Sequence, residues 1–260
     1  MSYLIDSHCH VHDDGYGFNW DDVVAGCKEA SVGQMICIGT DAQNSQAAVD
    51  FAHDKAGVYA SIGLHPHEAA RIGEDDFELL TVLSAEEKVV AIGECGLDYY
   101  YNHSTPAEQR TVLEFQLALA RQAGKPCVFH VREAFDDFWP VYDECNDVRG
   151  VIHSFSGGIS DMEAILSRNL YVGLNGIMLF SKDPAHRRIA TELPLEKLLL
   201  ETDAPYLTPP PLRGTMNEPA NVRLVAAYLA GLREIPVDTL IEATTSNARK
   251  LFRLRDDTIT

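Results

Sequence analysis

The chain has 260 residues, enough for one large hydrophobic core, and an α/β barrel of about 250 residues is an ordinary single domain. Its 46% hydrophobic and 23% charged residues exclude an intrinsically disordered chain. The 39 Asp and Glu residues outnumber the 21 Lys and Arg residues and give a net charge of −18, which argues against a protein that grips a polyanion along its whole surface.

Short apolar segments alternate with longer amphipathic ones along the chain. The apolar segments predict eight strands, over residues 3–11, 34–40, 58–66, 89–99, 126–131, 150–155, 170–174 and 197–202. Segments such as 35–38 and 198–200 are continuously apolar. This pattern is typical of parallel strands that are buried on both faces.

Between the strands, apolar residues recur with the spacing of a helix face. The clearest helices are predicted around residues 20–27, 113–120 (after a start signal at Thr105-Pro106) and 222–229. Eight strands separated by helices predict one (β/α)8 barrel, a single domain over residues 1–260. A doubly wound open sheet is the alternative, but it usually has a glycine-rich phosphate loop where this chain has His8-Cys9-His10.

Residue types that bind metals lie at the ends of the predicted strands. His8 and His10 alternate along the first strand, so their imidazoles project together, as a divalent ion such as zinc requires. The fourth, fifth, sixth and eighth strands end in four further candidates: Glu94, His130, His153 and Asp203. Because the carboxyl ends of barrel strands converge on one face, we predict a metal centre there.

Each of these residues alone has an ordinary structural explanation, but their coincidence at five strand ends favours a metal centre. Six ligands exceed the three protein ligands and one water of a catalytic zinc, so two ions that share a carboxylate are predicted. Asp203 would also accept the proton of the attacking water. Four other histidines are expected to be structural or exposed bystanders: His12, His53, His103 and His186.

The six cysteines form no C-x-x-C pair, so zinc-ribbon and thioredoxin-like sites lack their motif. Buried, reduced thiols in a cytoplasmic protein are expected. The chain begins without a basic segment followed by a long apolar one, and no apolar run approaches the ~18 residues of a membrane span. We therefore expect no signal peptide and no contact with a membrane.

Eight segments, in this order, are similar to the TatD family of metal-dependent deoxyribonucleases, which belongs to the amidohydrolase-like barrels. They are DSHCH (6–10), GLHPH (63–67), IGECGLDYYY (92–101), KPCVFHVREA (125–134), HSFSG (153–157), ETDAPYL (201–207), RGTMNEP (213–219) and SNARKLF (246–252). The resemblance extends from Asp6 to Phe252. It implies a hydrolase of phosphodiester bonds that acts on DNA ends or single strands.

The resemblance also implies roles for particular residues. One ion would be bound by His8, His10 and Asp203, and the other by His130 and His153. Glu94 would bridge the two ions and act with Asp203 in catalysis.

Three residues are implied as substrate contacts. His65 would donate a hydrogen bond to the scissile phosphate, and Arg132 and Arg213 would contact phosphates, because a guanidinium group matches phosphate geometry. Asn217 and Glu218 are expected to order the loop after the eighth strand, with a helix cap as the alternative role.

Two positions depart from the family pattern. Ser154 stands where the family often has Cys, in a position expected to face away from the metals. The family often has Arg after an Asp-Tyr or Asp-Phe pair, whereas this chain has the run Tyr99–Tyr101. These tyrosines could stack on an unpaired base, but we expect them to be buried in packing.

Two other functions remain open. A two-metal barrel can hydrolyse an amide, lactone or ester instead, because a fold does not fix its substrate. No lysine at a strand end is placed to bridge two metals after carbamylation, which weakens one such comparison. A noncatalytic binding module would have broken ligands, whereas all six are present. The residue types accept Zn²⁺, Mn²⁺ or Mg²⁺.

The charge of the chain narrows the predicted substrate. The net charge is −14 over residues 1–100 but −4 over residues 101–260. Two divalent ions would supply +4 against −2 from Glu94 and Asp203, so the pocket would be locally cationic by +2. We therefore predict a pocket that takes a DNA end or a short oligonucleotide, with weak affinity for duplex and no obligate protein partner.

Overall fold

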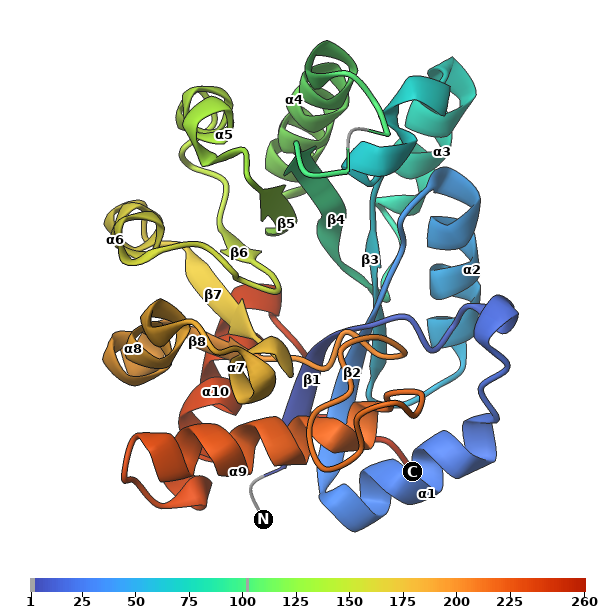
Figure 1. Cartoon of the computed structure of the whole chain (residues 1–260). Helices are drawn as coiled ribbons and strands as arrows, with labels where there is room; N and C mark the ends of the chain where they lie inside the picture. The colour runs from blue at the N-terminus through green and yellow to red at the C-terminus, as the bar shows by residue number, and fades with distance from the viewer. Residues whose placement is uncertain (1–2, 102) are drawn as a thin grey trace.

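Eight parallel strands in sequence order form an inner ring with helices on its outside (Figure 1). The computed structural model describes residues 3–101 and 103–260. The strands are β1 (Leu4–Cys9), β2 (Val32–Ile38), β3 (Val58–Ile62), β4 (Val89–Asp98), β5 (Cys127–Arg132), β6 (Gly150–Ile152), β7 (Tyr171–Leu174) and β8 (Leu198–Leu200). Each strand pairs with the next along the chain. The (β/α)8 barrel is confirmed, and the open-sheet alternative is wrong.

The helices that surround the strands occupy the predicted intervals. They are α1 (Trp20–Ala30), α2 (Ala42–His53), α3 (Glu74–Leu83), α4 (Pro106–Ala123), α5 (Phe135–Asp143), α6 (Ile159–Ser167), α7 (Ile177–Phe180), α8 (Pro184–Glu192), α9 (Val222–Leu232) and α10 (Val237–Phe252). Short 3₁₀ turns are η1 (Asp14–Tyr16), η2 (Pro66–Arg71), η3 (Leu195–Lys197) and η4 (Pro219–Asn221). The predicted start of α4 is confirmed, because Thr105 and Glu108 form a capping box there.

Four strands are clearly shorter than predicted. β1 and β3 end at Cys9 and Ile62, whereas the predicted strands extended to residues 11 and 66. β6 and β8 each span three residues, although apolar runs predicted strands over 150–155 and 197–202. Ser154 and Asp203 have φ values of 45° and 59°, in the left-handed region, which an extended strand cannot accommodate. The chain therefore leaves the sheet where the candidate metal ligands occur.

The barrel closes between β8 and β1 through the residues that follow β8. The backbone N–H of Asp203 donates to the His8 carbonyl at 2.9 Å. The buried carboxylate of Asp6 accepts hydrogen bonds from the backbone N–H of Thr202 at 2.9 Å and from its hydroxyl at 2.6 Å. This seam holds Asp203 next to His8 and His10.

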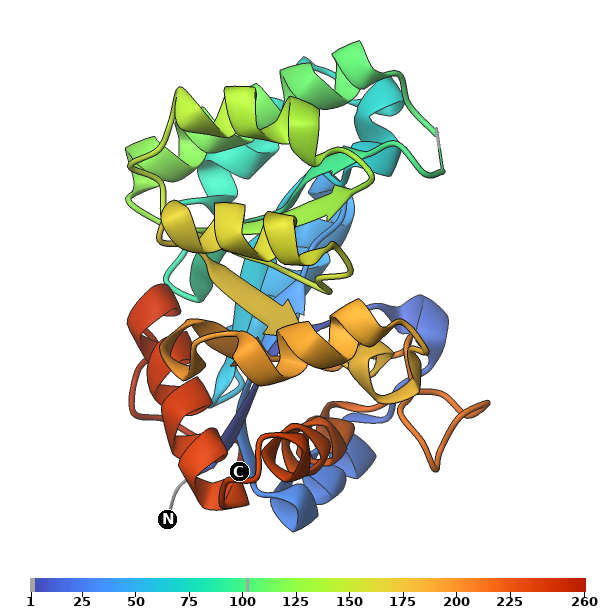
Figure 2. The ribbon, with the colours of Figure 1, turned by 60° about the vertical axis from the view of Figure 1, so that its left-hand side comes forward.

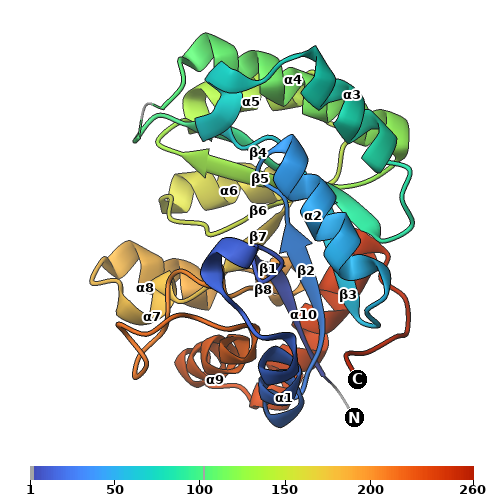
Figure 3. The ribbon, with the colours of Figure 1, turned by 90° about the vertical axis from the view of Figure 1, so that its right-hand side faces the viewer.

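The barrel interior is filled by apolar side chains from all eight strands, including Val128 and Val151. Leu251 and Phe252 of α10 belong to the same cluster and cover the end where the chain begins. Figures 2 and 3 show α10 at that end, and the loop after β8 projects at the other (orange in Figure 2). Because side chains alternate along a strand, His130 and His153 lie one layer beyond Val128 and Val151.

The thiol prediction is confirmed for five cysteines, which are buried and free, whereas Cys145 is half-buried and free. Across residues 3–101 and 103–260, no helix combines the length and the apolar character that crossing a bilayer requires.

Candidate metal centre

Glu94, near the end of β4, lies between two groups of histidines. Its Oε1 atom lies 2.9 Å from His130 Nδ1 and 2.7 Å from His153 Nε2. Its Oε2 atom lies 3.5 Å from His8 Nε2. A single carboxylate thus faces both groups, one oxygen toward each.

Asp203, at the seam, completes the group on β1. Its Oδ1 atom lies 3.5 Å from His8 Nε2 and 3.4 Å from His10 Nε2. The rings of His8 and His153 stack with centroids 3.9 Å apart, so the two groups adjoin. The ligand atoms of two sets, His8 with His10 and Glu94, and Glu94 with His130 and His153, lie within 4.8 Å of one another. Each set has the nitrogen and oxygen donors of a divalent transition-metal site.

Hydrogen bonds on the outer side of two rings leave the inner nitrogen free to bind a cation. His10 Nδ1 donates to the Ile38 carbonyl at 3.0 Å, so Nε2 faces Asp203 with its lone pair. His130 Nε2 donates to Asp98 at 2.8 Å, so Nδ1 faces Glu94. Histidines that bind metals are usually held in this way, with the second nitrogen bonded to a carboxylate or a carbonyl.

Buried nitrogens without partners provide an independent test of whether a cation fits. Within the described part of the chain, both ring nitrogens of His8 and Nδ1 of His153 are buried and make no hydrogen bond. Such groups cost about 1–3 kcal/mol each when unpaired. A cation bound to His8 Nε2 removes one of these penalties, so the residues fit a metal ion.

The two carboxylates are held in their ionised form. Burial alone would raise the pKa of Glu94, but the neighbouring histidines, His153 foremost, outweigh it when they are protonated and hold that pKa well below its usual value. Burial is likewise outweighed at Asp203, whose pKa is lowered by His10 and His8. Ionised oxygens in a buried histidine cluster are suited to hold a cation.

The glycines on either side of Glu94 allow β4 to approach β5 closely. Gly93 and Gly96 have φ values of 142° and 150°. A Cβ atom on Gly96 would lie 1.9 Å from the His130 carbonyl oxygen, and one on Gly93 would lie 2.3 Å from the Val128 carbonyl oxygen. The sequence Gly-Glu-Cys-Gly therefore positions Glu94 against His130.

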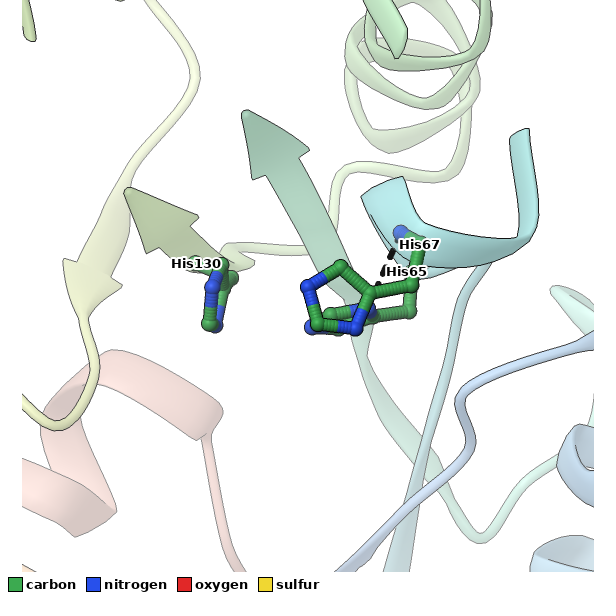
Figure 4. Close-up of side chains that lie close together, drawn as sticks. All are labelled: His65, His67 and His130. Atoms are coloured by element: carbon green, nitrogen blue, oxygen red, sulfur yellow. Dashed lines mark hydrogen bonds between the residues drawn. The ribbon is translucent and has the colours of Figure 1, made fainter. Parts of the chain in front are cut away.

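His65 precedes η2 and faces the same centre. Its Nδ1 atom accepts the backbone N–H of His67 at 3.2 Å, drawn as the dashed line in Figure 4, and its Nε2 atom lies 3.5 Å from Glu94 Oε1. Burial lowers the pKa of His65 to about 4. Glu94 raises this pKa and His130 lowers it, but burial has the largest effect. The ring is therefore neutral at pH 7, with its proton on Nε2, ready to donate toward the centre.

The two arginines expected to contact phosphate lie against aromatic rings. The Arg132 guanidinium lies 3.9 Å from the ring centroid of Tyr100 and 4.8 Å from that of Tyr101. Arg213 lies 3.9 Å from the ring centroid of Phe180, on the exposed loop after β8. Both belong to the rim rather than to the ligand cluster.

The expectation that the tyrosines are buried is wrong. Tyr100 and Tyr101 are each 50% exposed, and Tyr99 is half-buried with its hydroxyl donating to Asp137 at 2.9 Å. The cause is Asp98, whose Oδ1 atom accepts the backbone N–H groups of Tyr100 and Tyr101 at 2.9 and 3.0 Å. This turn directs the two side chains outward.

Asp98, His67 and Glu201 belong to the site, although the sequence reasoning gave them no role. Asp98 Oδ2 accepts hydrogen bonds from His130 Nε2 and, at 2.9 Å, from His67 Nε2. Glu201 Oε1 lies 3.6 Å from His153 Nδ1. The spacing along the chain could have indicated the two acids. Asp98 follows Glu94 by four residues and Glu201 precedes Asp203 by two, and residues an even number apart on a strand lie on the same face. The expected local charge of +2 counted only Glu94 and Asp203, whereas the structure places these two further acidic residues beside the histidines.

The remaining histidines lie outside the ligand sets around Glu94. Of the two roles expected for His12, the structural one applies, because the ring is buried with Nε2 3.1 Å from Asn44 Oδ1. His53 and His103 are exposed, and His186 is half-buried beside Ser181.

Asn217 orders the loop after β8, as predicted. Its buried amide donates to the carbonyls of Thr202 and Tyr206 at 3.0 and 2.7 Å. Glu218, by contrast, is exposed.

Comparison with known proteins places this architecture in a family. Residues 5–253 match the family described as "TatD related DNase". The "3'-5' ssDNA/RNA exonuclease TatD" of Edwardsiella piscicida is 39% identical over 259 residues, which cover 96% of this chain and 100% of that protein. The "Uncharacterized metal-dependent hydrolase YabD" of Bacillus subtilis (strain 168) is 34% identical over 253 residues, 96% of this chain and 99% of that protein. The crystal structure of YjjV, a TatD homolog from Escherichia coli K12, superposes with a TM-score of 0.91 at 29% identity and covers 97% of this chain and 98% of that one.

Proposed function

Because the chain belongs to the TatD-related DNase family and is a metal-dependent hydrolase, we propose that it hydrolyses phosphodiester bonds in DNA, at ends or in single strands. Two relatives support different parts of the proposal. The name of the Edwardsiella relative specifies a single-strand exonuclease, whereas that of the Bacillus relative specifies only a metal-dependent hydrolase. The bond that is cleaved is therefore the part that needs a test.

The observation that carries the proposal is the position of Glu94, with one oxygen toward each histidine group. We infer that two divalent ions bind, one held by His8, His10 and Asp203, the other by His130 and His153, with Glu94 shared. Zn²⁺, Mn²⁺ and Mg²⁺ all suit these donors. Two such ions activate a water and stabilise the charge of a phosphoryl transfer when bound.

The protein's own groups supply proton transfer and orientation. The ionised carboxylate of Asp203 accepts the proton of the attacking water, for which its lowered pKa keeps it ready. The neutral ring of His65 donates its Nε2 proton in a hydrogen bond to the scissile phosphate. Arg132 and Arg213, on the rim, contact the phosphates on either side.

All six cysteines are free thiols, as is typical of proteins in a reducing compartment, and on this ground we also propose a cytoplasmic location. The whole chain would act there as one hydrolase domain.

The test is hydrolysis of labelled single-stranded and blunt duplex DNA by protein stripped of metal and reloaded with Mg²⁺, Mn²⁺ or Zn²⁺. We expect metal-dependent cleavage of the single strand and of duplex ends, and its loss in Asp203→Asn and Glu94→Gln. Asp147→Asn, at an exposed carboxylate paired with Arg121, is the matched control. The proposal would be overturned if protein of verified metal content cleaved no DNA but hydrolysed an amide, lactone or ester in a parallel panel.

A further inference from the structure

We propose that Tyr100, Tyr101 and Arg132 form a platform on which an unpaired nucleobase stacks next to the metal centre. These three residues are called the aromatic platform below. The inference rests on the proposed function, because it needs a substrate that carries bases. It specifies the chemistry by which the site would select single strands.

The platform exposes aromatic side chains, which folded proteins usually keep largely buried. Tyr100 and Tyr101 are each 50% exposed, and their rings meet edge to face with centroids 4.8 Å apart at 86°. The His103 ring lies nearly parallel to that of Tyr101, with centroids 5.8 Å apart at 17°, so a ligand would add to this stack on the exposed half of the tyrosine rings. A planar base that covers this half gains stacking and removes apolar surface from water.

The platform is held in place before any ligand arrives. The buried carboxylate of Asp98 fixes the backbone N–H groups of both tyrosines, and the Arg132 guanidinium lies over both rings. Side chains that are fixed in advance lose little conformational entropy on binding. The arrangement therefore resembles a prepared binding surface rather than a loose loop.

A single side chain, that of Asp98, connects the platform to the candidate metal ligand His130. Asp98 holds both the tyrosine backbone and His130. The Tyr101 ring lies 5.3 Å from the ring of His67, which in turn lies 4.3 Å from the ring of His65. A base on the platform would therefore belong to a nucleotide close to the phosphate that His65 faces.

The charge of the platform also fits a nucleic-acid strand. Acidic residues, among them Asp98 and Glu201, surround the candidate ions, so a cationic side chain outside the ligand sets would add to the attraction for a phosphate. Within residues 3–101 and 103–260, Arg132 forms no ion pair with a carboxylate, which leaves its charge available to a phosphate. Aromatic faces combined with a cation are the usual means of binding single strands without sequence preference.

Base pairing explains why such a platform would discriminate against duplex. In an intact duplex both faces of an internal base are already stacked on its neighbours, so a protein ring can cover only a terminal or unpaired base. Selection of ends and single strands then follows from geometry rather than from overall affinity.

The test measures KM and kcat of the metal-loaded enzyme on a fluorescent single-stranded oligonucleotide and on versions with one abasic residue at each position in turn. We expect the double change Tyr100→Ala with Tyr101→Ala to raise KM by roughly 5-fold to 150-fold on the intact strand. An abasic residue at one position should raise KM of the unmodified enzyme by a similar factor. The same residue should add little further loss in the double variant, because the base and the rings act together.

Two controls keep the result specific. Tyr100→Phe with Tyr101→Phe retains the ring faces and should restore the low KM. Tyr228→Ala removes another exposed tyrosine, on α9, and should leave KM unchanged. Melting temperature and metal content report whether each variant is folded and loaded.

The outcomes separate the two proposals. If the unmodified enzyme cleaves no oligonucleotide, the proposed function fails and the platform fails with it. If it cleaves the strand but abasic residues and the alanine changes act additively, the platform is overturned while the nuclease function stands. That second outcome would leave the exposed tyrosines to contact a protein partner.

Discussion

Asp98 is the residue on which three parts of the site depend. It accepts hydrogen bonds from His130, His67 and the backbone of Tyr100 and Tyr101, and it is fully buried. Burial would raise its pKa, but the hydrogen bonds from His130, Tyr101 and His67 outweigh it and lower the pKa below its usual value. An ionised acceptor behind His130 fixes which nitrogen of that ring faces Glu94.

Asp98→Asn should therefore weaken metal binding. An amide NH₂ group facing His130 Nε2 cannot accept its proton, so the ring loses the contact that orients it. We expect a 10- to 100-fold lower metal affinity, of the order found when such outer contacts are removed. Isothermal titration of the metal-free protein measures it, with Asp147→Asn as the exposed control. Equal affinities in both variants would show that Asp98 does not position His130.

The sequence predicted the six residues that the structure brings together, but not the residues that contact them from behind. His8, His130 and Asp203 stand out because each polar residue interrupts or follows an apolar strand. Asp98 and Glu201 also lie at or just after strand ends. A residue that acts by positioning another, however, cannot be told from an ordinary salt-bridge partner by its type or its place in the sequence. The exposure of Tyr100 likewise depends on hydrogen bonds to Asp98, which only the structure reveals.

At the scale of elements, the contact between β4 and β5 depends on two glycines. Gly96→Ala should destabilise the fold by more than about 1 kcal/mol, because φ is 150° and the added Cβ meets the His130 carbonyl oxygen. Gly231→Ala in α9 meets no atom within 4 Å and should stabilise by about 0.5–1 kcal/mol. Urea unfolding of both variants measures the difference. Equal changes of one sign would show that backbone conformation does not determine the glycine at 96.

The C-terminal tail after α10 offers a pH-dependent test. The Asp257 carboxylate accepts the backbone N–H of Gly57 at 3.0 Å and the hydroxyl of Tyr59, and lies 3.8 Å from Lys88 Nζ. Burial would raise the pKa of Asp257, but these groups outweigh it and lower that pKa. Its stabilisation is therefore complete above the unfolded-state pKa of about 3.9 and is lost as pH falls through the folded value.

Asp257→Ala should accordingly lower the free energy of unfolding by about 1–3 kcal/mol at pH 7, because it leaves the Gly57 and Tyr59 donors without their acceptor. The difference from the unmodified protein should shrink below about pH 4. Asp256→Ala is the matched control, since its exposed pair with Arg249 contributes about 0–1 kcal/mol. A difference that stays constant from pH 7 to pH 3 would contradict the ionised contact.

Element boundaries show where apolar patterning stops being informative. The eight apolar runs predicted every strand, because parallel strands buried on both faces leave a strong signal. The early ends of β1, β3, β6 and β8 were missed, since a left-handed residue such as Ser154 has no signature in hydrophobicity. The closure through Thr202 and Asp6 was also missed, because hydrogen bonds between residues far apart in the sequence leave no hydrophobic pattern.

At the scale of the whole molecule, the candidate ions connect distant parts of the barrel. Their candidate ligands come from β1, β4 and β5 and from the segments directly after β1, β6 and β8. Ions that bind only the folded state add about 2.7 kcal/mol at a hundredfold excess over Kd. Chelation should therefore lower the melting temperature by roughly 5–10 °C for a domain of this size. An unchanged melting curve after verified metal removal would contradict binding at these strand ends.

The net charge of −18 determines how the molecule should meet DNA. Affinity for nucleic acid falls with salt by a slope of about −0.7 per phosphate neutralised on a single strand. With Arg132 and Arg213 as the contacting cations, the logarithmic slope should be about −1.4, far shallower than that of a protein with a basic groove. Arg132→Gln and Arg213→Gln should each make the slope less negative by about 0.7. Arg121→Gln is the control and should leave the slope unchanged, because Arg121 pairs with Asp147 at the surface. Titrations with a closed circular duplex, which has no ends, should give no submicromolar binding at physiological salt. A steep slope or tight duplex binding would require a cationic surface that this sequence does not supply.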